Sequence, residues 1–269
     1  MINPLRKRRS RYEIKTPEQF VKMREAGLVV ARTLTLLERE AKAGVTTKQL
    51  DDLAKEHIYD SGATSNFLGY HGFPGVICTS INEQIVHGIP GAQVIEEGDL
   101  VSVDCGAVVD GWHGDAAITL LIGEVAPEVA ALSEANREAL WAGIRAARAG
   151  TKLGDLGQVI EDAVRAAGDY GIVEDYVGHG IGTAMHMDPN VPNIGFPGRG
   201  DELEVGMAIA IEPQLTLGEY DTVTLDDDWT VVTSDGSIAA HWEHTVAITE
   251  DRPWVLTAED GGTEILQSA

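Results

Sequence analysis

A two-helix segment occurs twice in this chain of 269 residues, and the repeat limits the folds that the chain can adopt. Ala41-Lys42-Ala43-Gly44 is followed 106 positions later by Ala147-Arg148-Ala149-Gly150. Downstream positions correspond at the same offset: Leu50, Leu53, Ile58 and Gly62 match Leu156, Val159, Val164 and Gly168. Strand-like sequence follows each helix pair. We therefore expect an α+β fold of two related halves, at about residues 17–122 and 127–250, with the helices on one face of a sheet.

Capping signals predict where the helices of the first pair begin. Thr16-Pro17-Glu18-Gln19 combines an N-cap Thr, a Pro at the first helical position and a Gln that completes a capping box. This helix should continue to about Lys42. Thr46 and Gln49 provide a second capping box, for a helix that reaches Tyr59.

Charge is unevenly distributed along the chain. Residues 1–16 contain six basic residues and one acidic residue, a net +5, which leaves −28 for the rest and −23 in total. Because phosphate repels an acidic surface, nucleic-acid binding by residues 17–269 is disfavoured. We expect residues 1–16 to be a basic arm and residues 17–269 to be a single catalytic domain. The arm is either a solvated tail or a contact for RNA or a ribosome surface.

Cysteine content and hydropathy favour a cytoplasmic enzyme. The chain contains only Cys78 and Cys105, too few for a disulfide framework or a thiolate metal cage. No apolar h-region follows the N-terminal charges, and no run of about 18 apolar residues could span a membrane. We expect reduced thiols and no membrane association.

The segment 101–118 is predicted to form a hairpin that brings two aspartates together. Asp110-Gly111 between strand-like runs is a strong signal for a two-residue turn. The numbers of cross-strand partners then sum to 221, so Asp104 and Asp115 share one face while Cys105 points the other way. Two carboxylates on a sheet interior are costly unless a metal compensates them, and a solvated sheet face is the equal alternative.

Three further ionisable residues have unusual neighbours. His179 lies in Gly178-His179-Gly180-Ile181-Gly182, where the backbone is exposed and a ligand can approach, although a lone histidine is more often structural. Glu212 lies beside Pro213 at the end of an apolar strand, and Glu243 lies within the strand-like segment 239–248. Neither glutamate has a Lys or Arg nearby in the sequence, which favours a metal as their partner. Each of the five residues is therefore a candidate metal ligand, beside a structural alternative.

Five motifs, in this order, are similar to those of the bacterial type I methionine aminopeptidase family: Val86-His87-Gly88-Ile89-Pro90, the pair Asp104 and Asp115, Gly178-His179-Gly180-Ile181-Gly182, Ile211-Glu212-Pro213, and Trp242-Glu243-His244-Thr245. The resemblance covers residues 17 to about 250. It implies the pita-bread fold, in which two pseudo-symmetric halves form a curved antiparallel sheet with helices on its outer face. About 33 residues separate His179 from Glu212, too few for the helical insertion of the type II enzymes.

The resemblance also implies roles for individual residues. The metal ligands would be Asp104, Asp115, His179, Glu212 and Glu243, holding two divalent ions of Mn, Fe or Co. Asp115 and Glu243 would bridge the ions, and Glu212 would be the general base. His186 would help to hold the oxyanion, and His87 would contact the scissile amide nitrogen. The pocket for the methionine side chain would be lined by Tyr70, Phe73, Cys78, Met185 and Trp229, with His87 and His186 also contacting substrate.

The implied activity is removal of the N-terminal methionine from nascent proteins when the second residue is small, by a monomer. Four residues depart from the family pattern and leave the pocket shape and the hydrogen bonds around Glu243 open: Phe67, Phe73, Met185 and His241. An aminopeptidase P or prolidase-like X-Pro peptidase is one alternative, although only about 16 residues precede the first helix. A non-catalytic pita-bread protein that binds peptides is another, against which the complete ligand set argues.

Overall fold

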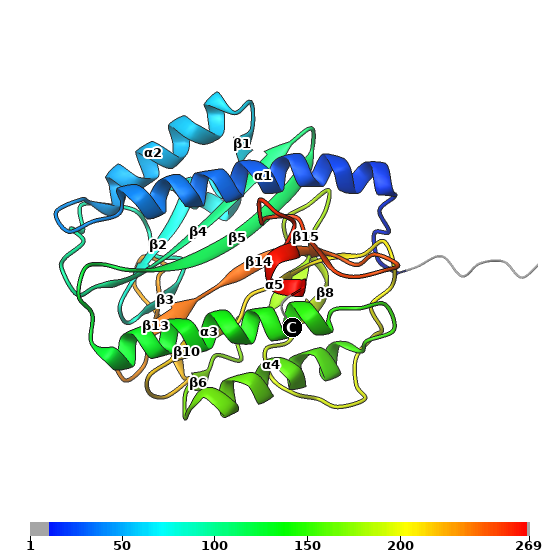
Figure 1. Cartoon of the computed structure of the whole chain (residues 1–269). Coiled ribbons are helices and arrows are strands. Elements are labelled where there is room, and N and C mark those ends of the chain that lie inside the picture. The colour runs from blue at the N-terminus through cyan, green and yellow to red at the C-terminus, as the bar shows by residue number, and fades with distance from the viewer. Residues whose placement is uncertain (1–10, 268–269) are drawn as a thin grey trace, which may run out of the picture.

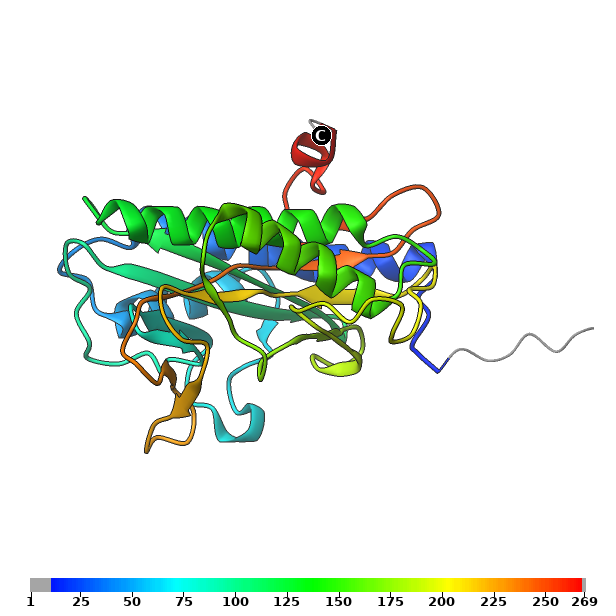
Figure 2. The ribbon, with the colours of Figure 1, turned by 90° about the horizontal axis from the view of Figure 1, so that it is seen from below.

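The computed structural model describes residues 11–267, so the basic residues at positions 6–9 lie outside the described part of the chain. Two helix pairs cover one face of a central sheet (Figure 1). Figure 2 shows that shorter strands and loops lie on the opposite face. Within residues 11–267, none of the helices combines the length and the apolar character needed to cross a membrane.

The predicted helix repeat is present. The helices are α1 (Pro17–Glu40), α2 (Thr47–Asp60), α3 (Pro127–Ala146), α4 (Leu153–Ala167) and a short α5 (Thr263–Gln267), with a 3-10 turn η1 at Tyr70–Gly72. α2 and α4 begin 106 residues apart. Both predicted capping boxes form, with Thr16 capping α1 and Thr46 capping α2. α1 ends at Glu40 rather than Lys42, because Ala41 already has extended backbone angles.

The central sheet contains nine antiparallel strands, and its order joins the two halves. Along the main path the order is β1-β4-β5-β14-β9-β7-β8, while β2 pairs with β4 and β15 pairs with β14. The pairing of β5 with β14 connects the first half to the second. The strands are β1 (Thr64–Ser65), β2 (Ile77–Ile81), β4 (Leu100–Val109), β5 (Trp112–Leu121), β7 (Gly178–Gly180), β8 (Met187–Val191), β9 (Ala208–Ile211), β14 (Glu243–Ala247) and β15 (Trp254–Val255).

Two three-stranded sheets complete the fold. One has the order β13-β10-β6 and the other β11-β12-β3. Their strands are β3 (Gln84–Val86), β6 (Gly171–Ile172), β10 (Gln214–Thr216), β11 (Thr222–Thr224), β12 (Val231–Thr233) and β13 (Ala239–His241). The segment 239–248, predicted as one strand, is therefore divided at Trp242. At the break, the backbone N–H of His241 donates to the side-chain hydroxyls of Ser102 on β4 and Thr119 on β5.

The hairpin of β4 and β5 has the predicted register. Asp104 faces Ala117 and Gly106 faces Asp115. Asp110 and Gly111 both have positive φ, at 50° and 79°, as a tight two-residue hairpin turn requires. The two aspartates therefore lie on the same face of the sheet.

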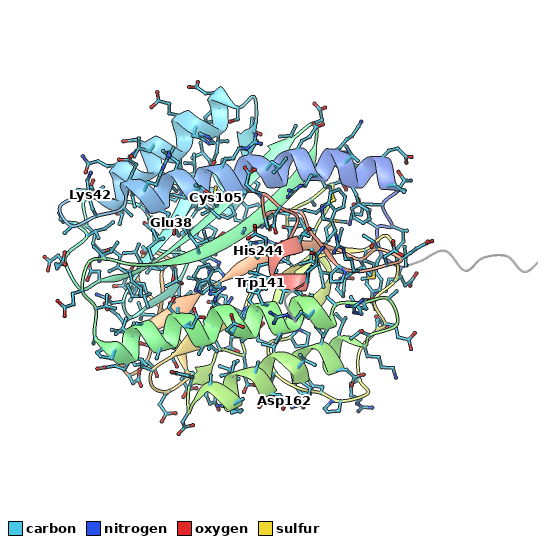
Figure 3. The ribbon with its side chains drawn as sticks, viewed as in Figure 1. Glu38, Lys42, Cys105, Trp141, Asp162 and His244 are labelled. Carbon is cyan, nitrogen blue, oxygen red and sulfur yellow. The ribbon has the colours of Figure 1, made fainter. Side chains whose placement is uncertain are left out.

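Each half has its own hydrophobic core between its helices and the sheet. Cys105 belongs to the core of the first half, where it lies under α1 (Figure 3). The core of the second half includes Trp141 of α3, whose ring centroid is 5.3 Å from that of His244 on β14 (Figure 3). Cys105 thus lies on the helix side of the sheet, opposite to the aspartates, as predicted.

Gly27 permits a close approach that fixes α1 on the sheet. A Cβ at this position would overlap the carbonyl oxygen of Leu256. We expect Gly27→Ala to lower the free energy of unfolding by about 2 kcal/mol, because overpacking outweighs the better helix propensity of alanine. Urea unfolding measures the change. Glu25→Ala, at an exposed position of the same helix, is the control, and an equally small effect of both variants would contradict the prediction.

Candidate metal centre

The predicted site residues meet in one pocket of about 470 Å³. All twelve of them line it, together with three that were not predicted. The lining residues are Phe67, Tyr70, His71, Phe73, Cys78, His87, Asp104, Asp115, His179, Met185, His186, Glu212, Asp228, Trp229 and Glu243. The pocket is thus built by both halves of the fold.

The five predicted ligands stand on five consecutive strands of the central sheet. Asp104 lies on β4, Asp115 on β5, Glu243 at the start of β14, Glu212 directly after β9, and His179 on β7. The strand order β4-β5-β14-β9-β7 therefore places them in a row. Glu243 pairs with Ala117, which lies two residues from Asp115 on the same face. The sheet register alone brings residues up to 139 positions apart in the sequence into one cluster.

Three of the five predicted ligands place their donor atoms close enough together to hold one cation. One ligand atom each of Asp115, His179 and Glu243 lie within 4.8 Å of one another. Nε2 of His179 is 3.5 Å from Oε1 of Glu212. Oδ1 of Asp104, Oδ1 of Asp115 and Oε1 of Glu243 are buried without a hydrogen-bond partner among the described residues. Among those residues no Lys or Arg lines the pocket, so a divalent cation fits this set of unpaired oxygens.

Burial changes the pKa of every group in the cluster. It raises the pKa of Asp104 to about 7. Burial and the neighbouring carboxylates raise the pKa values of Asp115, Glu212 and Glu243 well above their usual range. Four carboxylates this close cannot all ionise without a positive partner.

His179 is held in the form that a metal requires. Burial lowers its pKa to about 4, so the imidazole is neutral near pH 7. Its Nδ1 is 3.0 Å from the carbonyl oxygen of Gly180, to which the neutral ring donates. This hydrogen bond leaves the Nε2 lone pair free to bind a cation.

Glu212 has two polar neighbours, Gln214 and His241, of which His241 is the residue that the resemblance marked as a departure. Nε2 of Gln214 donates to Oε2 of Glu212 at 2.9 Å. Nε2 of His241 lies 3.7 Å from the same oxygen, and burial lowers the pKa of His241 to about 3. The substituted histidine therefore borders Glu212, whereas the sequence left open its effect on Glu243.

The two other predicted histidines lie at the rim of the cluster. Nδ1 of His186 is 2.8 Å from the hydroxyl of Tyr70, and its ring centroid is 4.4 Å from that of His179. Burial lowers the pKa of His87 to about 4. Both histidines also line a second hollow of about 470 Å³, which runs on past Tyr176 and Asn190.

An apolar wall closes the pocket beside the cluster. Phe67, Phe73, Cys78 and Met185 are buried together there, with Tyr70, Ile89 and Trp229 packed against them. Phe73 contacts Trp229 edge to face at 5.0 Å and Phe67 at 6.5 Å between ring centroids. Cys78 pairs with Asp104 across β2 and β4, so the wall begins directly next to the carboxylates. Its size and softness suit an unbranched, sulfur-containing side chain.

Two lining residues gave no signal in the sequence. Asp228 belongs to the acidic run Asp226-Asp227-Asp228 and is exposed, yet it also borders the pocket. His71 lies in the 3-10 turn with a φ of 46°. Neither residue belongs to a strand-like sequence pattern, and neither has the spacing of a metal-ligand motif. They reach the site only because the loops that carry them fold against it.

The carboxylate cluster predicts a pH-dependent instability of the metal-free protein. A carboxyl group whose folded pKa is raised stabilises the fold below its unfolded pKa and loses that contribution as the pH rises through the folded value, about 7 for Asp104. We expect the Tm of metal-free Asp104→Asn to be about 2–4 °C higher than that of metal-free wild type at pH 8, which corresponds to a difference of roughly 1 kcal/mol in the free energy of unfolding. The difference in Tm should shrink towards pH 5. Adding Mn²⁺ should stabilise wild type more than the variant. Differential scanning fluorimetry after chelation tests this, and a metal-free wild type that is the more stable at pH 8 would contradict it.

Comparison with known proteins agrees with this geometry. The model of metallopeptidase family M24 matches residues 21–250. Methionine aminopeptidase 1 of Mycobacterium tuberculosis is 56% identical over 241 residues, covering 87% of this chain and 91% of that protein. Methionine aminopeptidase of Clostridium acetobutylicum is 51% identical, covering 91% of this chain and 98% of that protein.

The solved structures agree with the predicted architecture. Methionine aminopeptidase from Thermotoga maritima is 41% identical and has a TM-score of 0.90, with 91% of this chain and 99% of that chain covered. The pita-bread fold expected from the sequence is thereby confirmed. Since both the family model and these relatives span nearly all of the fold, the chain is a metal-dependent hydrolase that belongs to metallopeptidase family M24 and, within it, to the bacterial type I methionine aminopeptidases.

Proposed function

We propose that this chain is a dinuclear-metal aminopeptidase that removes the N-terminal methionine of nascent proteins when the second residue is small. The observation that carries the proposal is the presence, in one pocket, of five ligand-type side chains and a sulfur-tolerant apolar wall. The charged cluster supplies the hydrolytic chemistry, and the wall accepts the methionine side chain.

The proposed ligands are Asp104, Asp115, His179, Glu212 and Glu243. Four carboxylates and one imidazole form a hard donor set, which favours Mn, Fe or Co over a thiolate-type zinc site. Asp115 and Glu243 would each hold both ions, as the resemblance implies; like Asp104, each has a buried oxygen without a hydrogen-bond partner among the described residues. When bound, the two cations would polarise the scissile carbonyl and lower the pKa of a water molecule.

The residues around the ligands would handle protons and orientation. Glu212 is proposed as the general base, since Gln214 binds one of its oxygens and leaves the other facing the cluster. If the hydroxyl of Tyr70 donates to Nδ1 of His186, Nε2 of His186 carries the proton and can donate to the oxyanion. His87, neutral near pH 7, would contact the scissile amide nitrogen.

The cellular setting follows from the same proposal. The enzyme would act in the cytoplasm, as a monomer, on the N-termini of nascent chains. The basic arm would contact the ribosome; most of its charge precedes residue 11, outside the described part of the chain.

Substrate choice tests the proposed function. We expect the Mn²⁺- or Co²⁺-loaded enzyme to release Met from Met-Ala peptides and not from Met-Lys peptides, as the proposed preference for a small second residue requires. Chromatography of the free amino acid measures release. General release of X from X-Pro peptides would favour the prolidase-like alternative, and no turnover with any metal would favour the non-catalytic one.

Glu243→Ala should abolish turnover, whereas Cys105→Ala, on the far face of the sheet, should not.

His186 tests the proposed oxyanion contact. We expect His186→Ala to lower kcat by roughly 10²-fold, the usual effect of removing one oxyanion donor, with two metals still bound. Tyr70→Phe should have a smaller effect, because it removes only the partner of Nδ1. Steady-state kinetics and metal analysis measure both quantities. Loss of metal from His186→Ala would mean that His186 is itself a ligand.

A further inference from the structure

The segment immediately before α1 packs against the loop that carries two site residues. Residues 181–186 connect β7 to β8 and include Met185 of the apolar wall and His186. The side chain of Lys15 is only 3% exposed, and its Nζ donates to the carbonyl oxygen of Ile181 at 2.6 Å. In the sequence this lysine belongs to the basic arm, but its ammonium group points into the protein. The residue that it binds, Ile181, is two positions after His179 in the sequence.

Glu13 binds the same loop from the same segment. Its carboxylate accepts from the backbone N–H of Thr183 at 3.2 Å and from the hydroxyl of that residue. Nζ of Lys15 lies 3.3 Å from Oε1 of Glu13, so the two charges compensate each other. A Cβ at Gly182 would overlap that oxygen, which shows how closely the segment and the loop approach.

Two backbone contacts complete the arrangement. The N–H of Lys15 donates to the carbonyl of Gly206 at 2.8 Å, close to the start of β9, and Thr16 next to it caps α1. On the other side of the loop, the N–H of His113 on β5 donates to the carbonyl of Gly182 at 2.9 Å. The loop is therefore bound between the N-terminal segment and a strand that carries a proposed ligand.

Neither Glu13 nor Lys15 lines the pocket. Removing an ammonium group from water is costly, and its attraction to one carboxylate and one carbonyl does little more than offset that cost, so the pair adds little net stability. Its effect instead falls on the geometry of the loop. We propose that Glu13 and Lys15 are positioning residues that hold residues 181–186 so that His186 and Met185 meet the substrate; the proposal rests on the proposed function.

Three variants of the metal-loaded full chain test this. Lys15→Met keeps the apolar stem but removes the donor to Ile181, and Glu13→Ala removes the acceptor for Thr183. We expect both to lower kcat on a Met-Ala peptide by roughly 10- to 100-fold, the scale of a displacement of about 1 Å, with metal stoichiometry unchanged. Glu13→Gln retains an acceptor oxygen and should restore most of the activity.

Hydrogen exchange provides a readout that does not depend on activity. We expect the amides of residues 182–186 to exchange at least about 10-fold faster in Lys15→Met and Glu13→Ala, while the amides of α3 keep their wild-type rates. Arg11→Gln is the matched control, because it removes an exposed ion pair with Asp188 from the same segment and should change neither rate nor kcat.

Each outcome decides a separate point. Unchanged exchange in the loop, or faster exchange with wild-type kcat, overturns the positioning role. Faster exchange throughout the chain would show that the pair supports only global stability, and also overturns it. A wild-type enzyme that is inactive on every peptide overturns the proposed function and with it the catalytic part of this proposal, whereas the exchange rates still decide whether Glu13 and Lys15 hold the loop.

Discussion

The rest of this structure must hold four mutually repelling carboxylates close together. Asp104, Asp115, Glu212 and Glu243 come from strands of both halves, and their pKa values are all raised in the absence of a cation. A sheet can keep them together only if its own pairing is strong enough to resist their separation. The ten-residue strands β4 and β5, covered by α1, supply that rigidity in the first half. The pairing of β5 with β14 then holds the carboxylates of the second half against this rigid part of the sheet. The same strands therefore join the two halves and position the proposed metal ligands.

Specificity and chemistry are divided between different kinds of structure. The proposed ligands stand on or directly beside paired strands, whereas the apolar wall comes largely from loops and turns near residues 67–73, 185 and 229. A ligand moved by an ångström would lose its cation, but a wall of soft apolar groups can repack. This difference fits the four positions that the resemblance marked as departures: Phe67, Phe73 and Met185 lie in the wall, His241 borders the cluster, and the five proposed ligands are all present. The wall also excludes water and so strengthens the electrostatic interactions of the cluster beside it.

How far the sequence predicted this arrangement depends on how local each determinant is. The juxtaposition of Asp104 and Asp115 could be derived from the residues alone, because a two-residue turn fixes the register of its own strands. Membership of Glu212, Glu243 and His179 in the same cluster could not, since it requires the order β5-β14-β9-β7, and only the resemblance to a family indicated it. Where segment 239–248 divides at Trp242, His241 contacts Ser102 and Thr119 of the other half, which no local pattern reveals. The positions of His71 and Asp228 depend likewise on loops that fold against distant strands.

The N-terminal segment shows how a count of charges can conceal a structural role. In the sequence, Lys15 is one of six basic residues before the first helix, and the arm as a whole resembles a solvated tail. Lys15 differs from the others because Thr16 caps α1, and α1 is fixed on the sheet by the close contact at Gly27. The residue before the cap therefore cannot move freely, and its side chain is directed at Ile181. The start of a helix on the outer face thereby sets the position of a loop in the active site, and a lysine buried beside a single carboxylate connects the two.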